Sequence, residues 1–239
     1  MGTIEELQQR VSVRVFEPTG ISDEAKASIL ACAFAAPTAG NQMMYTILDI
    51  EDPAIKARLA DLADHQPFVA SAPWVLVFLA DCRRWYDGYV LAGETPRPPG
   101  VGDFVLAGQD ALIAAQNAVT AAWSLGIGSC YIGDIMENCE AVRELLELDP
   151  WVFPATMVVF GYPTPQQRRR RKPERFDRQY IVLTDRYRRL TDDEQRAMYT
   201  RRGQDLGTYL PGFCRRKYMS DFAVEMTRSV GAYLEAFKG

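Results

Sequence analysis

The sequence predicts an α+β fold in a single domain, and three observations predict it. Two continuous apolar runs of strand length, at residues 73–80 and 155–162, are typical of central strands covered on both faces. Residues that cap helices recur between and after these runs. The 239 residues contain no internal repeat and no clear linker, so we predict one domain over 1–239, in which 191–239 form a C-terminal helical extension.

The elements in the first half of the chain follow from local signals. Residues 3–9 predict a short helix, and Ser22 predicts the cap of a helix that runs to about Ala35. Residues 45–50 predict a strand. Asp52-Pro53 predicts the start of a helix that ends near Asp64, because proline suits the first helical position. Residues 88–102 are rich in proline and glycine and predict a surface loop, of the kind that often forms a lid.

The second half is predicted to be mostly helical outside its central strand. The apolar stretch at 105–125 contains Gln109, Asp110 and other polar residues, so we expect a buried helix and no membrane span. Residues 138–146 predict another helix, and the Thr191–Glu194 capping box predicts the start of a third. The apolar spacing over 218–237 predicts a final amphipathic helix, which needs a surface to cover.

Composition limits the classes of function. A formal net charge of −4 argues against general nucleic-acid binding, although the run Arg168–Arg171 is locally basic. The five cysteines form no CxxC pair and are odd in number, which disfavours a disulfide framework or a zinc site. The N-terminus has no apolar segment typical of a secretory signal. We therefore expect a cytoplasmic protein that binds neither nucleic acid nor membrane.

Two segments have side chains suited to an anionic ligand with a polar ring. Arg10, Ser12 and Arg14 alternate, so an extended backbone would direct all three side chains to one side, either toward a phosphate or toward solvent. The turn at 37–41 suits close approach of backbone to a ligand, and Asn41 offers both an amide donor and an acceptor. A simple turn between helix and strand is the alternative interpretation.

Two further segments bear on the same ligand. Gly126, Gly128 and Gly133 do not match a dinucleotide fingerprint, so we predict a tight turn whose N–H groups at 132 and 133 face developing negative charge. The basic residues at 168–175 suit a phosphate, or form a solvated turn. His65, the only histidine, is expected to be structural or peripheral, and Cys130 to be a small core residue.

Together these segments resemble the nitroreductase family of FMN-dependent NAD(P)H oxidoreductases, including its flavin reductase branches. The resemblance spans most of the chain. It rests on Arg10-x-Ser12-x-Arg14-x-Phe16, Ala36–Asn41, His65–Val69, Leu125–Gly133, Gly161–Pro163 and Lys172–Phe176. The sequence departs from the family pattern at Val11, where many relatives have a second cation, and at Met43-Met44-Tyr45, where many have Gln-Pro-Trp.

The resemblance implies a central mixed or antiparallel sheet flanked by helices, in an intertwined homodimer whose C-terminal extension embraces the partner. The phosphate and ribityl chain of FMN would be held by Arg10, Ser12 and Arg14, with Lys172 and Arg175 or Arg170. Gln66 would lie at the pyrimidine side of the ring. The Ile132 and Gly133 amides would approach N5 and O4 from the opposite subunit. The full implied FMN-binding set is Arg10, Val11, Ser12, Arg14, Pro37, Thr38, Asn41, Gln66, Phe68, Tyr131, Ile132, Gly133, Arg170, Lys172 and Arg175.

The activity implied is ping-pong transfer of hydride from NAD(P)H through flavin N5 to a small-molecule acceptor, such as a nitroaromatic, a quinone, an azo dye or free flavin. No catalytic side chain is expected, because the cofactor carries the redox chemistry. A specialised flavoenzyme of the same fold, such as a reductive dehalogenase or a flavin-fragmenting enzyme, is an alternative. A non-catalytic protein that binds anions through Arg168–Lys172 is another.

Overall fold

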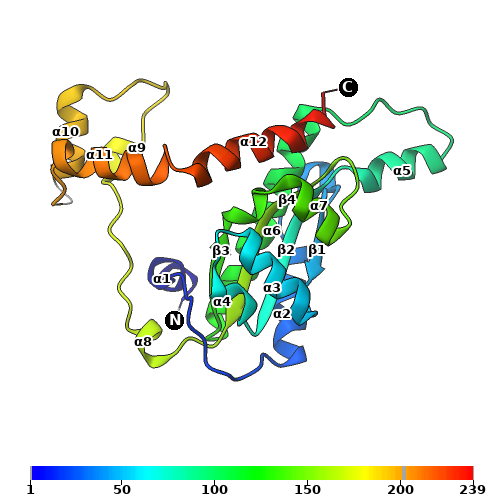
Figure 1. Cartoon of the computed structure of the whole chain (residues 1–239), viewed down its shortest axis with the longest axis horizontal. Coiled ribbons are helices and arrows are strands. Elements are labelled where there is room, and N and C mark those ends of the chain that lie inside the picture. Colours follow the sequence, from blue (N-terminus) through cyan, green and yellow to red (C-terminus); the bar gives the residue numbers. More distant parts are fainter. Residues whose placement is uncertain (1, 201–202, 239) are drawn as a thin grey trace. The chain divides into compact units, whose positions relative to one another are not determined.

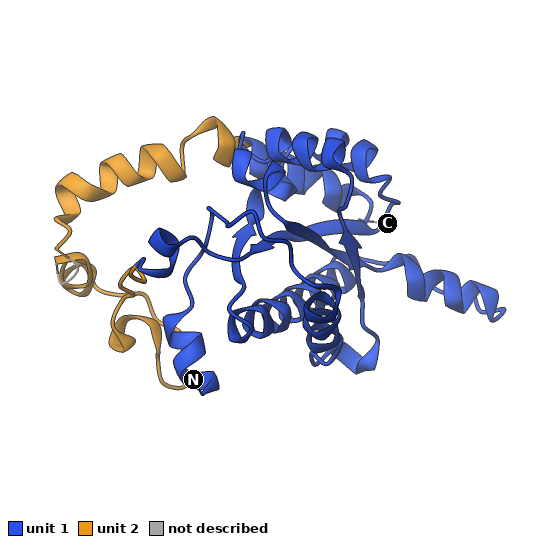
Figure 2. Cartoon of the chain, turned by 90° about the horizontal axis from the view of Figure 1, so that it is seen from below, with its two compact units in different colours: residues 1–170, 225–239 blue, residues 171–224 orange. Residues whose placement is uncertain are grey.

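The computed structural model describes residues 2–200 and 203–238. Its chain divides into two compact units, which Figure 2 distinguishes by colour. Met1–Arg170 and Glu225–Gly239 form the first unit, and Arg171–Val224 form the second. The sheet lies wholly in the first unit. Single-domain organisation remains a prediction.

The first unit is built on a four-stranded sheet with the order β1-β2-β4-β3 (Figure 1). The strands are β1 Tyr45–Asp49, β2 Trp74–Asp81, β3 Gly128–Ile132 and β4 Val152–Gly161. All three neighbouring pairs are antiparallel. The register shifts between Phe78 and Leu79, opposite Pro154, as expected for a proline inside a central strand.

The helices that the caps and apolar spacing predict are present close to their predicted bounds, whereas the helices at 67–70, 83–91, 165–168, 178–181 and 206–217 were not predicted. Those before β3 are α1 Thr3–Gln9, α2 Asp23–Phe34, η1 Ala39–Asn41, α3 Pro53–Leu62, α4 Pro67–Ala70, α5 Arg83–Leu91 and α6 Val101–Ser124. Those after β3 are η2 Gly133–Met136, α7 Cys139–Leu146, α8 Pro165–Arg168, α9 Arg178–Ile181, α10 Asp192–Thr200, α11 Leu206–Lys217 and α12 Asp221–Glu235.

The predicted caps are confirmed by their hydrogen bonds. The Ser22 hydroxyl accepts from the Ala25 amide, 3.3 Å, and the Asp52 carboxylate accepts from the Ala54 amide, 2.7 Å. At α10, the Thr191 hydroxyl and the Glu194 carboxylate each accept from the other residue's backbone N–H, which completes the capping box.

The sheet has a hydrophobic core on each face, because successive strand residues point in opposite directions. Trp74, Leu76 and Phe78 pack with residues of α2, α6 and the C-terminal part of α12. Val75 and Val77 pack with residues of α3, α4 and α7. All eight residues of β2 are buried, as the continuous apolar run predicts.

Two sequence predictions of loop are wrong. The predicted loop at 88–102 is shorter, since α5 continues to Leu91 and α6 begins at Val101. Asp103 accepts a hydrogen bond from the Gly100 amide, 2.8 Å, and so caps the N-terminus of α6. Gly102, which was predicted to lie in the loop, is therefore in the first turn of this helix. The predicted tight turn at 126–133 contains strand β3, whose pairing with β4 is a long-range interaction that glycine spacing does not reveal.

The segment before α2 adds to the β3 edge of the sheet. Ser12 forms a parallel bridge with Ser129, and the Val13 amide donates to the Ser129 carbonyl, 2.9 Å. A Cβ at Gly128 would lie 2.6 Å from Val13 Cγ2, a distance that side chains do not tolerate. Gly128 is therefore required for this close approach.

Helix α6 buries only part of its surface. Its small residues, such as Ala107, Ala111 and Ala114, are buried against the sheet. The exposed face contains the apolar residues Val101, Val105, Leu106, Leu112 and Ile113. The predicted burial of this helix is thus correct for one face. None of the helices among the described residues is long and apolar enough to cross a membrane.

Candidate functional site

The Arg10–Arg14 segment presents alternating side chains at the edge of β3. Val11 and Val13 are buried, whereas Arg10 and Ser12 are half-buried and Arg14 is exposed. This alternation matches the extended backbone that the sequence predicts. One terminal nitrogen of Arg10, Nη1, is buried without a hydrogen-bond acceptor among the described residues. A half-buried guanidinium with an unused donor is suited to an anionic ligand.

The basic run after β4 divides into residues with different roles. Arg170 reaches the Arg10–Arg14 segment, since its Nη1 donates to the Ser12 carbonyl, 3.5 Å. Arg168 instead donates through Nε to the Pro163 carbonyl, 3.0 Å. Lys172 and Arg175 belong to the second unit, where Arg175 donates to the Pro173 carbonyl. Within the first unit, Arg170 is therefore the residue of this run best placed to join Arg10 and Arg14.

Gln66 and Phe68 lie near the same end of the sheet. The Arg14 guanidinium lies 5.9 Å from the centre of the Phe68 ring. Gln66 Nε2 donates to the Ala63 carbonyl, 2.8 Å, and to Asp134 Oδ2, 2.9 Å. Asp134 lies in η2, directly after β3. The structure thus connects the Arg10–Arg14 segment, the Gln66 region and the end of β3 within one chain.

The three predicted residues at the end of β3 have different environments. Ile132 is buried, and Gly133 is exposed at the start of η2. The Tyr131 hydroxyl donates to Gln116 Oε1 on α6, 3.2 Å, and burial raises the pKa of Tyr131 to about 12. Tyr131 therefore lies on the α6 side of the sheet and remains protonated at neutral pH.

The loop at 37–41 lies at the opposite edge of the sheet. It leads through η1 into β1, which is separated from β3 by the two central strands, so the two edge strands lie about 14 Å apart. Pro37 and Asn41 are exposed, and Asn41 has a left-handed backbone with φ of 57°. A single chain therefore does not bring Thr38 and Asn41 to the Arg10–Arg14 segment.

Sequence reasoning missed the residue that holds this loop. Asp110 on α6 is 2% exposed and accepts from the Thr38 hydroxyl, the Ala39 amide at 2.9 Å and the Met44 amide at 3.2 Å. The signal was present: Asp110 lies between Ala107 and Ala111, on the buried face of its helix. A buried acid in such a place must bind donors.

Glu137 is a second residue that sequence reasoning missed. It is 5% exposed and lies directly after η2. Burial, followed by the negative charges of Asp134, Asp64 and Glu225, raises the pKa of Glu137 to about 7. A carboxyl group near Gln66 therefore titrates close to neutral pH.

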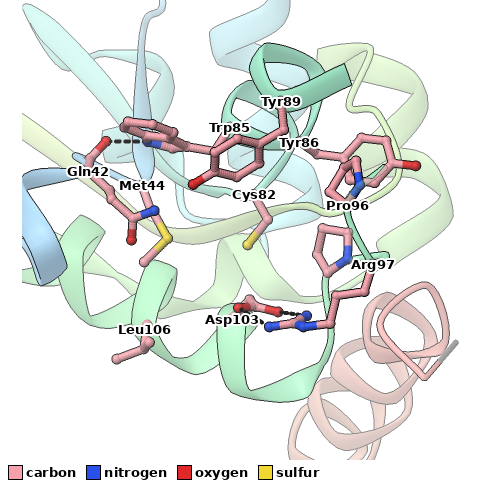
Figure 3. A pocket seen from close by; sticks show the side chains of 11 residues that line it. Gln42, Met44, Cys82, Trp85, Tyr86, Tyr89, Pro96, Arg97, Asp103 and Leu106 are labelled. Carbon is pink, nitrogen blue, oxygen red and sulfur yellow. Dashed lines mark hydrogen bonds and ion pairs between the residues drawn. The ribbon is translucent and has the colours of Figure 1, made fainter. Parts of the chain in front are cut away.

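A pocket of about 410 Å³ lies beside the 37–41 loop, between α5 and α6 (Figure 3). Trp85 donates through Nε1 to the Gln42 carbonyl, 2.7 Å, and its ring centre lies 5.7 Å from that of Tyr89. Burial, followed by Asp103 and Asp81, raises the pKa of the Cys82 thiol to about 12. The pocket is lined by Gln42, Met44, Cys82, Trp85, Tyr86, Tyr89, Pro96, Arg97, Pro99, Asp103 and Leu106. It offers aromatic surface and an un-ionised thiol.

Two side chains that sequence analysis set aside are peripheral to these groups. The His65 side chain is 85% exposed, in agreement with a peripheral role. Cys130 is buried in the core, as predicted, and burial raises the pKa of its thiol. Neither has the environment of an activated nucleophile or base.

A family model described as the nitroreductase family matches residues 7–162. The chain is 32% identical over 200 residues to a protein of Bacillus subtilis named FMN reductase (NADPH), covering 83% of this chain and 79% of that protein. It is also 32% identical to the oxygen-insensitive NADPH nitroreductase of Salmonella typhimurium, with 85% of each chain covered.

Solved structures share the whole fold. NfrA2 of B. megaterium superposes with a TM-score of 0.84 at 27% identity, covering 100% of this chain and 99% of that one. NfrA1 nitroreductase of B. subtilis superposes with a TM-score of 0.80 at 27% identity, covering 94% and 98% of the two chains.

Proposed function

The chain belongs to the nitroreductase family, and from that premise we propose that it is an NAD(P)H-dependent FMN oxidoreductase that reduces nitroaromatic, quinone or flavin acceptors. The observation that carries this proposal is the grouping of cations and one amide around the end of β3. Arg10 contributes a buried, unused donor, and Gln66 lies at the other end of the group.

The residues present fit FMN. Arg10, Ser12, Arg14 and Arg170 would bind the phosphate, because forked guanidinium donors match its oxygens. Phe68 and Gln66 would face the ring, and Gly133 would offer its backbone N–H. When bound, FMN supplies the redox chemistry, accepting hydride from NAD(P)H at N5 and passing electrons to the acceptor in a second half-reaction. Val11, Tyr131 and Ile132 remain proposed members of this site, and for Lys172 and Arg175, which belong to the second unit, the role implied by the family resemblance remains a prediction.

We propose a homodimer in which the 37–41 loop of one protomer completes the site of the other. This assignment differs from the expectation that Ile132 and Gly133 approach from the partner. Gly133 follows β3 and Gln66 bonds Asp134, so these residues belong to the same group as Arg10 within one protomer. The 37–41 loop lies at the far edge and reaches a flavin only from a second copy. The exposed apolar face of α6 supplies a surface for the pairing.

The pocket between α5 and α6 is the proposed determinant of acceptor choice. It adjoins Gln42, the residue after the 37–41 loop, so the dimer would place its aromatic wall near the flavin. Residues 92–100 form its rim and replace the longer lid expected from sequence. A pocket with Trp85 and Tyr89 favours planar aromatic acceptors. A narrow response to a panel of acceptors would favour the specialised flavoenzyme instead.

We propose a cytoplasmic location, since five cysteines without disulfide spacing suit a reducing compartment.

The visible absorption spectrum of the purified protein, recorded anaerobically, tests the proposed function. A bound-flavin spectrum that bleaches on addition of NADPH or NADH is the expected result. A protein that takes up no added FMN, or whose bound flavin stays oxidised with both nucleotides, would contradict it.

A further inference from the structure

The loop that leads into β1 contains a strained residue. Gly40 and Asn41 both have φ of 57°, and Met43 has φ of 49°. Glycine and asparagine adopt this left-handed region readily, whereas an apolar side chain such as that of methionine adopts it only at a cost. A residue keeps such a conformation where the contacts around it fix the backbone. The contacts of Met43 therefore indicate what holds this loop in shape.

The peptide group between Gln42 and Met43 is hydrogen-bonded at both ends. Its N–H donates to the Thr38 hydroxyl, 2.7 Å, and that hydroxyl donates to the buried carboxylate of Asp110. Its carbonyl accepts from the indole N–H of Trp85 on α5, 2.7 Å, a bond that Figure 3 draws. Because both ends are bonded, the plane of this peptide group is fixed, and the orientation of that plane determines φ at Met43.

The next peptide group, between Met43 and Met44, is held in the same way. Its N–H donates to Asp110 Oδ2, 3.2 Å. Its carbonyl accepts from the Tyr45 amide, 2.7 Å, and from Arg84 Nη1 on α5, 3.3 Å. The two peptide groups that flank Met43 are thus bonded to Asp110 or its partner at their N–H ends and to α5 at their carbonyl ends. Together they fix both backbone angles of Met43.

Helix α5 is itself anchored where it meets the loop. Asp81, the last residue of β2, accepts from the Arg83 amide, 2.9 Å, and from the Arg84 amide, 3.2 Å. The Arg84 side chain also donates through Nη2 to the Thr46 hydroxyl on β1, 2.6 Å. The first turn of α5 is therefore tied to two strands of the sheet. It presents the Trp85 indole and the Arg84 guanidinium to the loop from a fixed position.

We propose that Trp85, assisted by Arg84, is a positioning residue for FMN, because it keeps residues 40–43 in the conformation that presents Asn41 and its neighbours to the cofactor. Without the indole N–H, the Gln42 carbonyl loses its donor and the loop samples other conformations. FMN then has to order the loop when it binds, which weakens its affinity. Trp85 also forms a wall of the pocket between α5 and α6, so one side chain would shape the pocket and hold the flavin loop. This inference rests on the proposed FMN site and homodimer.

The test compares two identical substitutions. Trp85→Phe keeps an aromatic ring and removes the indole N–H, and Trp85 is 37% exposed, so the core is not disturbed. Trp151→Phe is the matched control, because the Trp151 indole also donates to a backbone carbonyl at 2.7 Å, that of Ala236. FMN is added to flavin-free protein, and its dissociation constant is measured by quenching of flavin fluorescence. Amide hydrogen exchange of the flavin-free protein gives a readout that does not involve FMN.

Trp85→Phe should raise the dissociation constant of FMN by about threefold to tenfold, the effect of one net hydrogen bond. It should also speed exchange of the Met43 and Met44 amides. Trp151→Phe should change the dissociation constant by less than about twofold and leave these two amides protected.

A second pair of variants tests the same contact on α5 if Trp85→Phe does not fold. Arg84→Met removes the donor to the Met43 carbonyl and should act in the same direction as Trp85→Phe. Arg83→Met removes the same charge from the neighbouring position, where the guanidinium donates to Asp87, and should leave FMN affinity and loop exchange unchanged.

A double-mutant cycle with Met43→Gly separates positioning of the loop from a general loss of stability. Glycine adopts the left-handed conformation without strain, so the loop needs less support from Trp85. In that background, Trp85→Phe should change the dissociation constant by less than about twofold. A general loss of stability would give the same ratio in both backgrounds.

Three results overturn the inference while the FMN site stands: equal FMN affinity of wild type and Trp85→Phe, an equal loss in Trp85→Phe and Trp151→Phe, or a ratio that Met43→Gly does not reduce. Failure of wild type and all variants to bind FMN overturns both the inference and the proposed function.

Discussion

Replacement of Glu137 by glutamine should make the flavin-free protein more stable at high pH and change its stability much less at low pH. The folded state raises the pKa of this carboxyl from 4.5 to about 7, mainly because the group is buried. Between these pH values the folded state binds more protons than the unfolded state, so the free energy of unfolding falls as the pH rises. At about 1.4 kcal/mol per pH unit, the loss is on the order of 3 kcal/mol. This loss of stability is absent below the pKa of the unfolded state, 4.5, and complete above the pKa of the folded state, about 7. Glutamine does not titrate, so the variant does not lose this stability.

Urea denaturation at pH 4.5 and pH 8, at one protein concentration, measures this difference. The free energy of unfolding of wild type is subtracted from that of Glu137→Gln at each pH. Because all other groups titrate equally in the two proteins, the change in this difference between pH 4.5 and pH 8 reports on Glu137 alone. We expect that change to be about 3 kcal/mol in favour of the variant. The same measurement on Glu144→Gln, an identical change at an exposed position of α7, should show no comparable change. A difference between wild type and Glu137→Gln that is the same at both pH values would refute the reasoning, because the pKa of Glu137 would then be the same in the folded and unfolded states.

Three other substitutions test the site and its supports. Arg10→Ala should weaken FMN binding by about 10- to 100-fold in fluorescence titration, because it removes a charge-assisted donor. Arg168 donates to a backbone carbonyl instead, so Arg168→Ala should change FMN binding less than about threefold. Gly128→Ala would place a Cβ 2.6 Å from a buried valine, and should cost about 1–3 kcal/mol in urea denaturation; unchanged stability would mean that the N-terminal segment does not pack there. Asp110→Ala leaves three donors unsatisfied and should cost about 2–4 kcal/mol. It should also speed amide hydrogen exchange in 38–44, and retained protection of that loop would contradict the role of Asp110.

Local signals were sufficient for most of the secondary structure. Ser22, Asp52 and Thr191 cap their helices as predicted, because a cap involves hydrogen bonds within three or four residues. The apolar runs at 73–80 and 155–162 lie in the two central strands, because burial on both faces leaves no polar positions. Strand β3 was not predicted, because its five residues carry no local signal for a strand. They form a strand only because β4 pairs with them.

The sequence by itself determined the fold class, the capped helices, the central strands and the residue types of an FMN site. Tertiary structure decided which of those residues lie together, and it separated the 37–41 loop from the Arg10–Arg14 segment by the full width of the sheet. It also distinguished Arg170 from Arg168, and it revealed Asp110 and Glu137. The physical reason is that caps and apolar runs depend on neighbours in the chain. Strand order and buried charge depend on residues that only folding brings into contact.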